Sequence, residues 1–443
     1  MKDTDYYMSE LMEFIAIPSI SADPACRKYL VEASSWLEKR LAGMGAQNVC
    51  SHDYCGIPMV TGDLFCGNPE APTLLLYGHY DVQPSGPEDL WESPPFRPER
   101  RGENLYGRGA TDMKGQILAL FAALDNCLEN HKSSWNYRFL FEGAEESDGS
   151  LLDGFIQENT AILECDLVLN VDAGMVGADF PSIVYGCRGI TGGKLIISGP
   201  AHDLHCGEFG GVVLNPVHAL CKVIAGLHDE SGRVTLPGFY EDLNIIGEEE
   251  RTLLAKLPMN EDFFRRETGV KHLWGELGFT PLERSVIRPI LEVVDLQVSG
   301  MSSSISPEAS ALLYFRLVPD QLPAKIKTLL EKHLDATVPD AVNWRLESWI
   351  GCKGTVCDPF SPAAQGLKEA LKSVWQTEPL LTRSGGSLPM AEYLQQRLNV
   401  EVLLTGFQLP EDNMHGPNEK LHIPTWEKGC LALQLFFQTP III

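Results

Sequence analysis

The segment Thr73-Leu74-Leu75-Leu76-Tyr77-Gly78-His79-Tyr80-Asp81 indicates the plan of the fold. Its first five residues form a short apolar run, which is typical of a strand buried on both faces of a parallel sheet. A glycine, a histidine and an aspartate follow, where this strand is expected to end. Because ligands bind beyond the carboxyl ends of the strands in an open α/β sheet, the segment predicts both a parallel strand and part of a site.

Three further segments repeat this pattern of a short apolar run followed by acidic residues or histidine. They are Tyr137–Phe141, Asp166–Val171 and Val402–Thr405. Helical patterns alternate with the predicted strands, notably at Lys114–Leu128 and Pro362–Trp375. Such alternation predicts an α/β fold in which helices cover the faces of a largely parallel sheet.

The middle of the chain follows a different pattern, which indicates a smaller α+β domain. Its predicted elements are a strand at Gly192–Ser198, a helix at Asn215–His228 and a strand at Ala311–Val318. A chain of 443 residues exceeds what one hydrophobic core usually organises, so two domains are expected. We therefore predict that residues 1–187 and 355–443 form one α/β domain, into which residues 188–354 are inserted.

The composition is that of a soluble globular protein, with 44% hydrophobic and 21% charged residues. The formal net charge of −25 disfavours binding to nucleic acid or to an anionic membrane surface. No apolar run approaches the roughly 18 residues that a membrane helix needs. The N-terminus also lacks the basic-then-apolar pattern of a signal peptide. We therefore expect a cytoplasmic protein with no nucleic-acid or membrane partner.

The acidic and histidine residues that follow the strands are expected to converge at one edge of the sheet. One such residue alone is usually a turn former, a helix cap or a satisfied polar group. Several carboxylates and two histidines together would repel strongly without a cation. Imidazole and carboxylate without thiolate suit zinc, and also manganese or cobalt. With one bridging carboxylate, five ligands would give each of two ions three protein groups and leave positions open for water and substrate.

Several motifs resemble the M20 metallopeptidase family, and more closely its carnosine-dipeptidase-like branch, which includes the cytosolic non-specific dipeptidases. The motifs are Gly78-His79-Tyr80-Asp81-Val82-Gln83-Pro84, Leu90-Trp91-Glu92-Ser93-Pro94-Pro95-Phe96, Tyr106-Gly107-Arg108-Gly109-Ala110-Thr111-Asp112-Met113-Lys114-Gly115, Phe141-Glu142-Gly143-Ala144-Glu145-Glu146-Ser147, Arg383-Ser384-Gly385-Gly386-Ser387 and His415-Gly416-Pro417-Asn418-Glu419. They occur in the family's order and span nearly the whole chain. The resemblance implies a zinc-exopeptidase-like α/β catalytic domain with an inserted lid and dimerisation domain.

The resemblance also implies roles for the residues at the strand ends. His79 and Asp172 would bind one zinc ion, Glu146 and His415 the other, and Asp112 both. The peptide bond between Asp112 and Met113 would be cis. Glu145 would be the general base that takes a proton from the metal-bridging water and passes it to the leaving amine. Asp81 would orient His79 as its hydrogen-bond partner.

Substrate contacts are implied elsewhere in the chain. Arg316 would bind the terminal carboxylate of the substrate through the paired donors of its guanidinium, although its position in an apolar run also suits a structural ion pair. Ser387 and the backbone of Gly386 would assist. His205, in the inserted domain, would reach the site of a neighbouring subunit and stabilise the oxyanion, with His202 as the competing candidate.

The sequence therefore predicts a homodimeric dizinc hydrolase. It would cleave the amide bond of dipeptides or short peptides with a free C-terminal carboxylate, through a metal-bridging hydroxide. One alternative keeps this chemistry but acts on N-acyl or N-carbamoyl amino acids. An alternative of another class is a catalytically inactive dimeric binding protein, which the presence of every ligand and of the base disfavours. The physiological substrate, the metal used in the cell and the role of segment 237–283 stay open.

Overall fold

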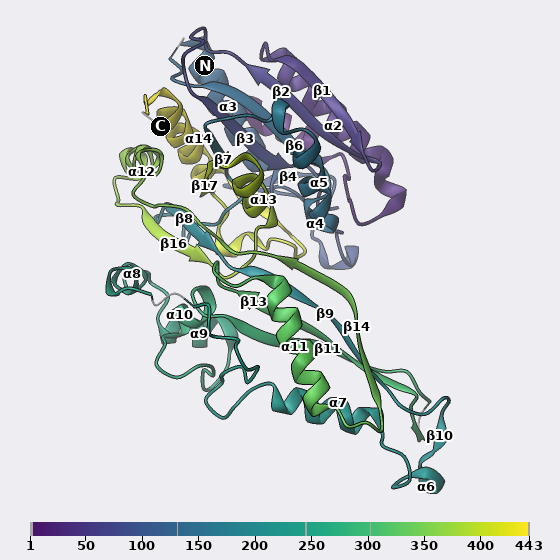
Figure 1. Cartoon of the computed structure of the whole chain (residues 1–443). Helices are drawn as coiled ribbons and strands as arrows, with labels where there is room; N and C mark the ends of the chain where they lie inside the picture. Colours follow the sequence, from purple (N-terminus) through teal and green to yellow (C-terminus); the bar gives the residue numbers. More distant parts are fainter. Residues whose placement is uncertain (1–2, 131, 244–245, 302, 442–443) are drawn as a thin grey trace. The chain divides into compact units, whose positions relative to one another are not determined.

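The computed structural model describes residues 3–130, 132–243, 246–301 and 303–441, which divide into two compact units (Figure 1). The first unit, which we call the catalytic unit after the catalytic domain that the resemblance implies, contains Met1–Tyr185, Cys357–Thr382 and Tyr393–Ile443. The inserted unit contains Gly186–Val356 and Arg383–Glu392. The domain limits at residues 188 and 354 stay a prediction. Residues 244 and 245 of the unassigned segment lie outside the described residues.

The catalytic unit is built around a sheet in which the strands follow the order β1-β2-β6-β3-β7-β17-β8. In chain order these are β1 (Gln47–Tyr54), β2 (Ile57–Leu64), β3 (Thr73–His79), β6 (Asn136–Glu142), β7 (Leu167–Asn170), β8 (Ser182–Cys187) and β17 (Glu401–Thr405). Strand β3 is parallel to β6 and β7, and β17 is parallel to β7. The four predicted parallel strands are therefore confirmed, and their carboxyl ends lie at one edge of the sheet.

Helices bury this sheet, which explains why its central strands are continuous apolar runs. Helix α3 (Lys114–Glu129) is buried along nearly its whole length because it packs on β3 and against α1 (Thr4–Ile15) and α14 (Ile423–Gln438). Helix α2 (Arg27–Gly43) packs against β1 and β2, and α12 (Pro362–Trp375) packs against α14. The shorter elements are α4 (Glu145–Asp148), α5 (Ser150–Glu158), β4 (Glu99–Arg101), β5 (Asn104–Tyr106) and β18 (Lys420–His422). The chain passes between the units again in β16 (Leu380–Ser384) and α13 (Pro389–Leu398).

The inserted unit contains an antiparallel sheet with the strand order β11-β13-β9-β14. The strands are β9 (Gly189–Ser198), β11 (Ile290–Val298), β13 (Glu308–Leu317) and β14 (Asn343–Cys352). Helices α7 (Pro216–Gly226) and α11 (Pro323–Thr337) pack on one face, over a core that includes Leu313, Phe315 and Leu317. Because side chains alternate along a strand, Arg316 lies on the opposite face.

The remaining elements of the inserted unit are short. They are β10 (Leu204–His205), β12 (Ser304–Ile305), β15 (Thr355–Val356), α6 (Cys206–Phe209), α8 (Glu248–Leu254), α9 (Glu261–Thr268) and α10 (Pro281–Val286). Helices therefore form in part of the segment that the sequence left unassigned. The predicted α/β fold with an inserted α+β domain is confirmed. None of the helices in the described part of the chain combines the length and the apolar character needed to cross a membrane.

Candidate metal centre

The parallel strands deliver their polar residues to one place. His79 is the last residue of β3, Glu145 and Glu146 begin α4 soon after β6, and Asp172 follows β7. Asp112 precedes α3, and His415 lies in the loop that leads to β18. The structure brings together three overlapping groups in which ligand atoms lie within 4.8 Å of one another: His79, Asp112 and Asp172; His79, Glu145 and Glu146; Asp112, Glu146 and His415.

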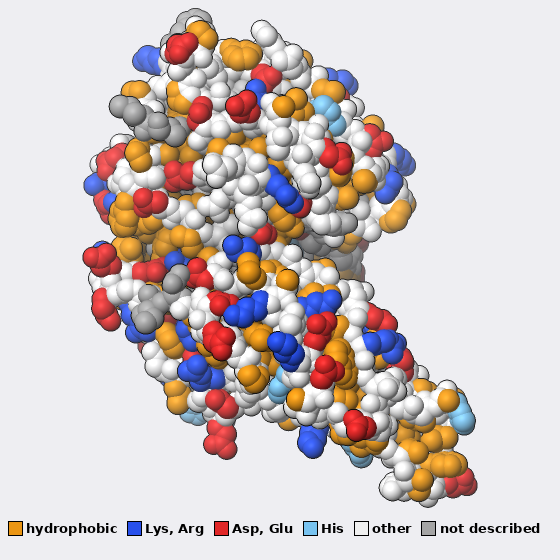
Figure 2. Space-filling view, in the orientation of Figure 1, with side chains coloured by type: hydrophobic (Ala, Val, Ile, Leu, Met, Phe, Trp, Pro, Cys, Tyr) orange, Lys and Arg blue, Asp and Glu red, His pale blue; other side chains and the backbone are white. Residues whose placement is uncertain are grey.

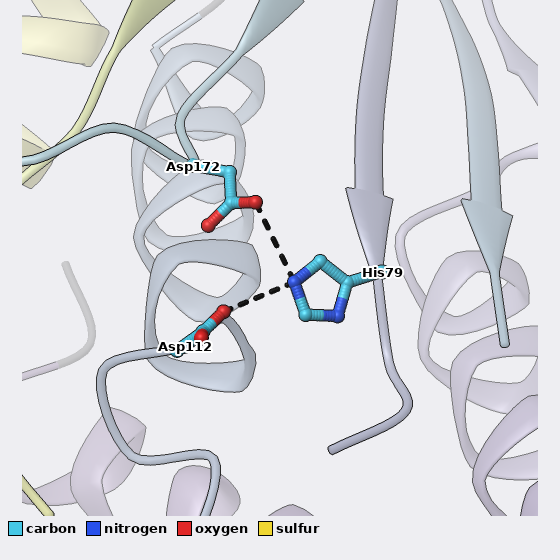
Figure 3. Close-up of side chains that lie close together, drawn as sticks. All are labelled: His79, Asp112 and Asp172. Carbon is cyan, nitrogen blue, oxygen red and sulfur yellow. Dashed lines mark hydrogen bonds and ion pairs between the residues drawn. The ribbon is translucent and has the colours of Figure 1, made fainter. Parts of the chain in front are cut away.

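Asp112 lies between two histidines, and each of its carboxylate oxygens faces one of them. Its Oδ1 is 3.1 Å from Nε2 of His79, and its Oδ2 is 2.8 Å from Nε2 of His415. Each histidine has a second carboxylate neighbour. Asp172 Oδ2 is 3.5 Å from His79 Nε2 (Figure 3), and Glu146 Oε1 is 3.3 Å from His415 Nε2. The cluster therefore consists of two similar halves that share Asp112, whose peptide bond to Met113 is cis, as expected.

The buried carboxylates perturb the pKa values of this cluster. Burial raises the pKa of Asp112, but its hydrogen bonds with His415 and His79 outweigh burial and hold that pKa well below its ordinary value. Hydrogen bonds with Asp112 and Glu146 raise the pKa of His415 to about 10. Burial raises the pKa of Glu145 well above its ordinary value, and neighbouring carboxylates add to the effect. Without metal, protons on the histidines and Glu145 offset the concentrated negative charge.

The donor set fits two divalent metal ions. His79, Asp172 and one oxygen of Asp112 would hold one ion, and His415, Glu146 and the other oxygen of Asp112 would hold the second. Three carboxylates and two neutral imidazoles carry fewer negative charges than two divalent ions carry positive ones, so the buried charges would be neutralised with room for an anionic ligand. Imidazole and carboxylate ligands without thiolate suit zinc, manganese and cobalt.

Asp81 supports both halves of the cluster from a fully buried position. Nδ1 of His79 lies 3.1 Å from the Asp81 carbonyl oxygen and 3.5 Å from its Oδ1. The other carboxylate oxygen of Asp81 accepts the backbone N–H of Glu146 at 3.0 Å. Asp81 therefore contacts both the ring of His79 and the backbone at the start of α4, where Glu145 and Glu146 lie.

Two glutamines contact the outer oxygens of the metal-ligand candidates, and the sequence did not predict either contact. Nε2 of Gln83 donates to Glu146 Oε2 at 2.8 Å, and Nε2 of Gln408 donates to Asp172 Oδ1 at 2.9 Å. Each glutamine therefore binds the carboxylate oxygen that does not face a histidine, and the other oxygen of Glu146 faces His415 while that of Asp172 faces His79. Gln83 lies inside a motif that carries the resemblance, but an amide in a motif does not reveal which carboxylate it binds.

Glu419 holds the loop that carries Asp112, and this role was also not predicted. Its buried carboxylate accepts the backbone N–H groups of Gly109, Thr111 and Asp112 at 3.0, 3.0 and 3.2 Å. It also accepts a hydrogen bond from Nη1 of the buried Arg108 at 2.7 Å. The loop therefore wraps around one carboxylate, which determines where the Asp112 backbone lies. The sequence feature that could have indicated this role is the position of Glu419 at the end of the last motif.

The other predicted site residues belong to the inserted unit. Nη1 of Arg316 donates to Ser387 Oγ at 2.9 Å, so the structure brings these two residues together. The N–H of Gly386 donates to Ser384 Oγ at 3.1 Å. His205 is exposed at the end of β10, and His202 is exposed just before that strand.

Comparisons with known proteins agree with the geometry of the cluster. Residues 75–439 match the model of peptidase family M20/M25/M40. The chain belongs to the M20 peptidase family. Its relatives include the Cys-Gly metallodipeptidase DUG1 of Saccharomyces cerevisiae, which is 29% identical over 98% of this chain and 95% of the relative. The mouse Beta-Ala-His dipeptidase is 26% identical over 98% of this chain and 92% of the relative.

Solved structures of M20 enzymes share the whole fold. The metallo-carboxypeptidase Sso-CP2 of Sulfolobus solfataricus has a TM-score of 0.86 and 29% identity, over 99% of each chain. The dipeptidase Dug1p of Saccharomyces cerevisiae has a TM-score of 0.84 and 28% identity, over 98% of this chain and 95% of the other. This M20 protein is therefore an enzyme of the metallopeptidase class, in the branch that contains the DUG1 and Beta-Ala-His dipeptidases.

Proposed function

We propose that this M20 enzyme hydrolyses dipeptides or short peptides with a free C-terminal carboxylate, using two zinc ions that manganese or cobalt can replace. The observation that carries the proposal is the position of Asp112, whose two carboxylate oxygens face His79 and His415 separately. Dipeptidases of the same branch resemble this chain over nearly its full length. The five ligands, Glu145 and Asp81 supply every group that the reaction requires on the catalytic unit.

The reaction begins with attack of water on the scissile carbonyl. Two bound zinc ions would polarise this carbonyl and lower the pKa of the attacking water, so that it reacts as hydroxide near neutral pH. Glu145 takes the proton from the water and later donates it to the leaving amine.

Residues of the inserted unit select and stabilise the substrate in this proposal. Arg316 binds its terminal carboxylate, and Ser387 with the backbone of Gly386 assists in this subsite. His205 donates a hydrogen bond to the oxyanion from a partner subunit. Its exposure at the end of β10 supports action on another copy of the chain.

We also propose that the protein is a cytoplasmic homodimer. Strand β11 is an edge strand, and it carries the exposed side chains of Val294, Leu296 and Val298. Hydrophobic side chains also gather at the end of the inserted unit that carries β10 and α6 (Figure 2), where Val212 and Met301 are 75% and 76% exposed. Exposed apolar edges of this kind are typical of interfaces. Analytical ultracentrifugation would test the dimer, and a monomer at all concentrations would contradict it.

Metal content and hydrolysis, measured on one preparation, test the function. We expect about two divalent ions per chain by elemental mass spectrometry, and cleavage of a small dipeptide panel that chelation abolishes and zinc restores. Bound metal with turnover only of N-acyl or N-carbamoyl amino acids would replace the dipeptidase assignment by an amidohydrolase. Protein that neither binds metal nor cleaves either class after reconstitution would contradict the enzyme mechanism.

A further inference from the structure

Arg188 is a buried arginine that no part of the proposed mechanism uses. It directly precedes β9 and is 7% exposed. Its Nε donates to the carbonyl of Gly385 at 2.9 Å, and its Nη1 donates to the carbonyls of Arg288 and Arg284 at 3.2 and 3.4 Å. The side chain therefore connects the Arg383–Ser387 motif to the end of α10, although these segments are about a hundred residues apart in sequence.

Among the described residues, Arg188 makes no ion pair with a carboxylate, although the charge of Glu292 acts on it from a longer distance. In the described part of the chain no carboxylate oxygen lies within 4.0 Å of Arg188 or of Arg316. Arg108, which is also buried, lies 2.7 Å from Glu419, and the partly buried Arg40 lies 2.7 Å from Asp125. Buried charges are normally paired because desolvation is costly. An unpaired buried guanidinium therefore indicates that its counter-ion arrives from outside the chain.

Arg188 and Arg316 lie on the same face of the inserted sheet. Ile190 is paired with Arg316 across β9 and β13, and Arg188 precedes Ile190 by two residues, so their side chains point the same way. Burial and the neighbouring charge of Arg316 together lower the pKa of Arg188 to about 10, against a smaller opposing effect of Glu292. Arg188, Arg316 and Ser387 form what we call the cationic face, which is the face opposite to α7 and α11.

We propose that Arg188 is a positioning residue of the carboxylate subsite: it holds the Gly385–Ser387 segment in place beside Arg316 and adds the positive charge that selects substrates with a free terminal carboxylate. The inference rests on the proposed function, in which Arg316 and Ser387 bind that carboxylate. Arg188 acts through Gly385 and through its charge, and not on the scissile bond. A purely structural role would instead require Arg188 only for folding, with no preference among substrates.

Substrate preference separates these two roles. The metal-loaded wild type, Arg188→Met and Arg188→Lys would be compared on one dipeptide and on the same dipeptide with a C-terminal amide. Loss of the positive charge and of the hydrogen bond to Gly385 predicts that KM for the free dipeptide rises about 10- to 100-fold in Arg188→Met, while kcat stays within about threefold. The rate on the amide should change little, so the preference for the acid falls. Arg188→Lys keeps the charge but not the planar fork, and should recover part of the preference.

The matched control is Arg345→Met. Arg345 lies on β14 of the same sheet, but it is exposed and paired with Glu308 and Glu347, so KM and preference should stay at the wild-type values. Equal losses on both substrates, or a lower kcat with unchanged KM, would overturn the proposal.

If Arg188→Met does not fold, the KM and the substrate preference of Arg188→Lys are used to test the proposal by the same criteria. If the wild type cleaves no dipeptide at all, the proposed function fails, and this outcome is distinct from an unchanged preference in an active enzyme.

Discussion

The metal centre and the cationic face are opposite in charge. The metal centre concentrates Asp112, Asp172, Glu145 and Glu146 around two histidines, and its pKa values are strongly perturbed. On the cationic face Arg188 is buried and Arg316 is partly buried, and no carboxylate oxygen of the described residues lies within 4.0 Å of either guanidinium. In the proposed function each region would receive the opposite charge from its ligand, which is metal cations at the first and a substrate carboxylate at the second. The proposal therefore treats both regions as preorganised for binding.

The buried ion pair of Arg108 and Glu419 differs from the arginines of the cationic face. Both side chains are almost completely buried, yet their charges are 2.7 Å apart and the glutamate also accepts three backbone N–H groups. The chain therefore does supply a partner where a buried arginine serves the structure. Among the described residues, Arg188 and Arg316 of the cationic face have no such ion-pair partner.

The largest expected effect comes from Glu145→Gln, which removes one negative charge from the metal centre without removing a metal ligand. Loss of a general base predicts a fall in kcat of about 10²- to 10⁴-fold. Elemental mass spectrometry should still find two metal ions per chain. Glu158→Gln, an exposed residue on α5 with the same change of charge, should have wild-type activity. Wild-type kcat in Glu145→Gln would remove this residue from the mechanism.

A second change, Arg316→Met, tests the opposite region. Loss of a charge-assisted hydrogen-bonded pair with the substrate carboxylate predicts a decrease in kcat/KM of about 10- to 100-fold for dipeptides, mostly through KM. The metal content should not change. Kinetics and metal analysis on the same sample check both statements. If Arg316→Met loses metal instead, the two regions are not independent and the comparison above is wrong.

The glutamine contacts predict effects on metal affinity. Gln83→Leu removes the donor to Glu146, and Gln408→Leu removes the donor to Asp172. Loss of such outer contacts typically weakens metal binding about 10- to 100-fold. Competition with a chromogenic chelator should show that each variant weakens one of the two ions. Gln157→Leu, an exposed residue on α5, serves as the control. Unchanged affinity for both ions would show that the side chains of Gln83 and Gln408 do not affect how strongly Glu146 and Asp172 bind metal.

The smallest expected effect is a pH dependence of stability in the metal-free protein. Its hydrogen bonds with Asp112 and Glu146 raise the pKa of His415 to about 10 in the fold, against about 6.5 when unfolded. A raised pKa stabilises the fold fully below pH about 6.5, and this stabilisation is lost as the pH rises towards about 10.

The melting temperature of the wild type, relative to His415→Asn, should therefore fall across this range when both proteins are metal-free. Metal-loaded wild type should not show this loss, because ligation requires the neutral imidazole. A constant difference between the two metal-free proteins would show that the histidine is not protonated in the cluster.

The sequence predicted the buried strands well, including the antiparallel β9 and β13 of the inserted unit, and missed exposed antiparallel strands. Strand β3 is buried along its length, so its residues form an apolar run that is visible without structure. Strand β14, in contrast, is largely exposed and has no such run, and β1 is similar. These antiparallel strands form because partners such as β9 and β2 pair with them, and that information is not local.

The residues of the site also divide into those that local sequence patterns predict and those whose contacts depend on distant segments. The five predicted ligands, Glu145 and Asp81 follow or lie between elements whose order is visible in the sequence. Gln83 contacts a residue 63 positions away in the sequence, and Gln408 contacts one 236 positions away. The partners of Glu419 are 307 to 311 positions away, and those of Arg188 are 96 to 197 positions away. No spacing along the chain encodes contacts of this kind.

The sequence by itself determined that this is an M20 enzyme with an α/β unit, an inserted unit and a cluster of acidic and histidine ligands at the strand ends. These features follow from local apolar runs and from motifs at fixed positions. Only the tertiary structure decided that the oxygens of Asp112 face two histidines and that Arg188 has carbonyl partners but no carboxylate. The reason is that distances between side chains, and the burial that gives charges their energetic weight, exist only once distant segments are packed together.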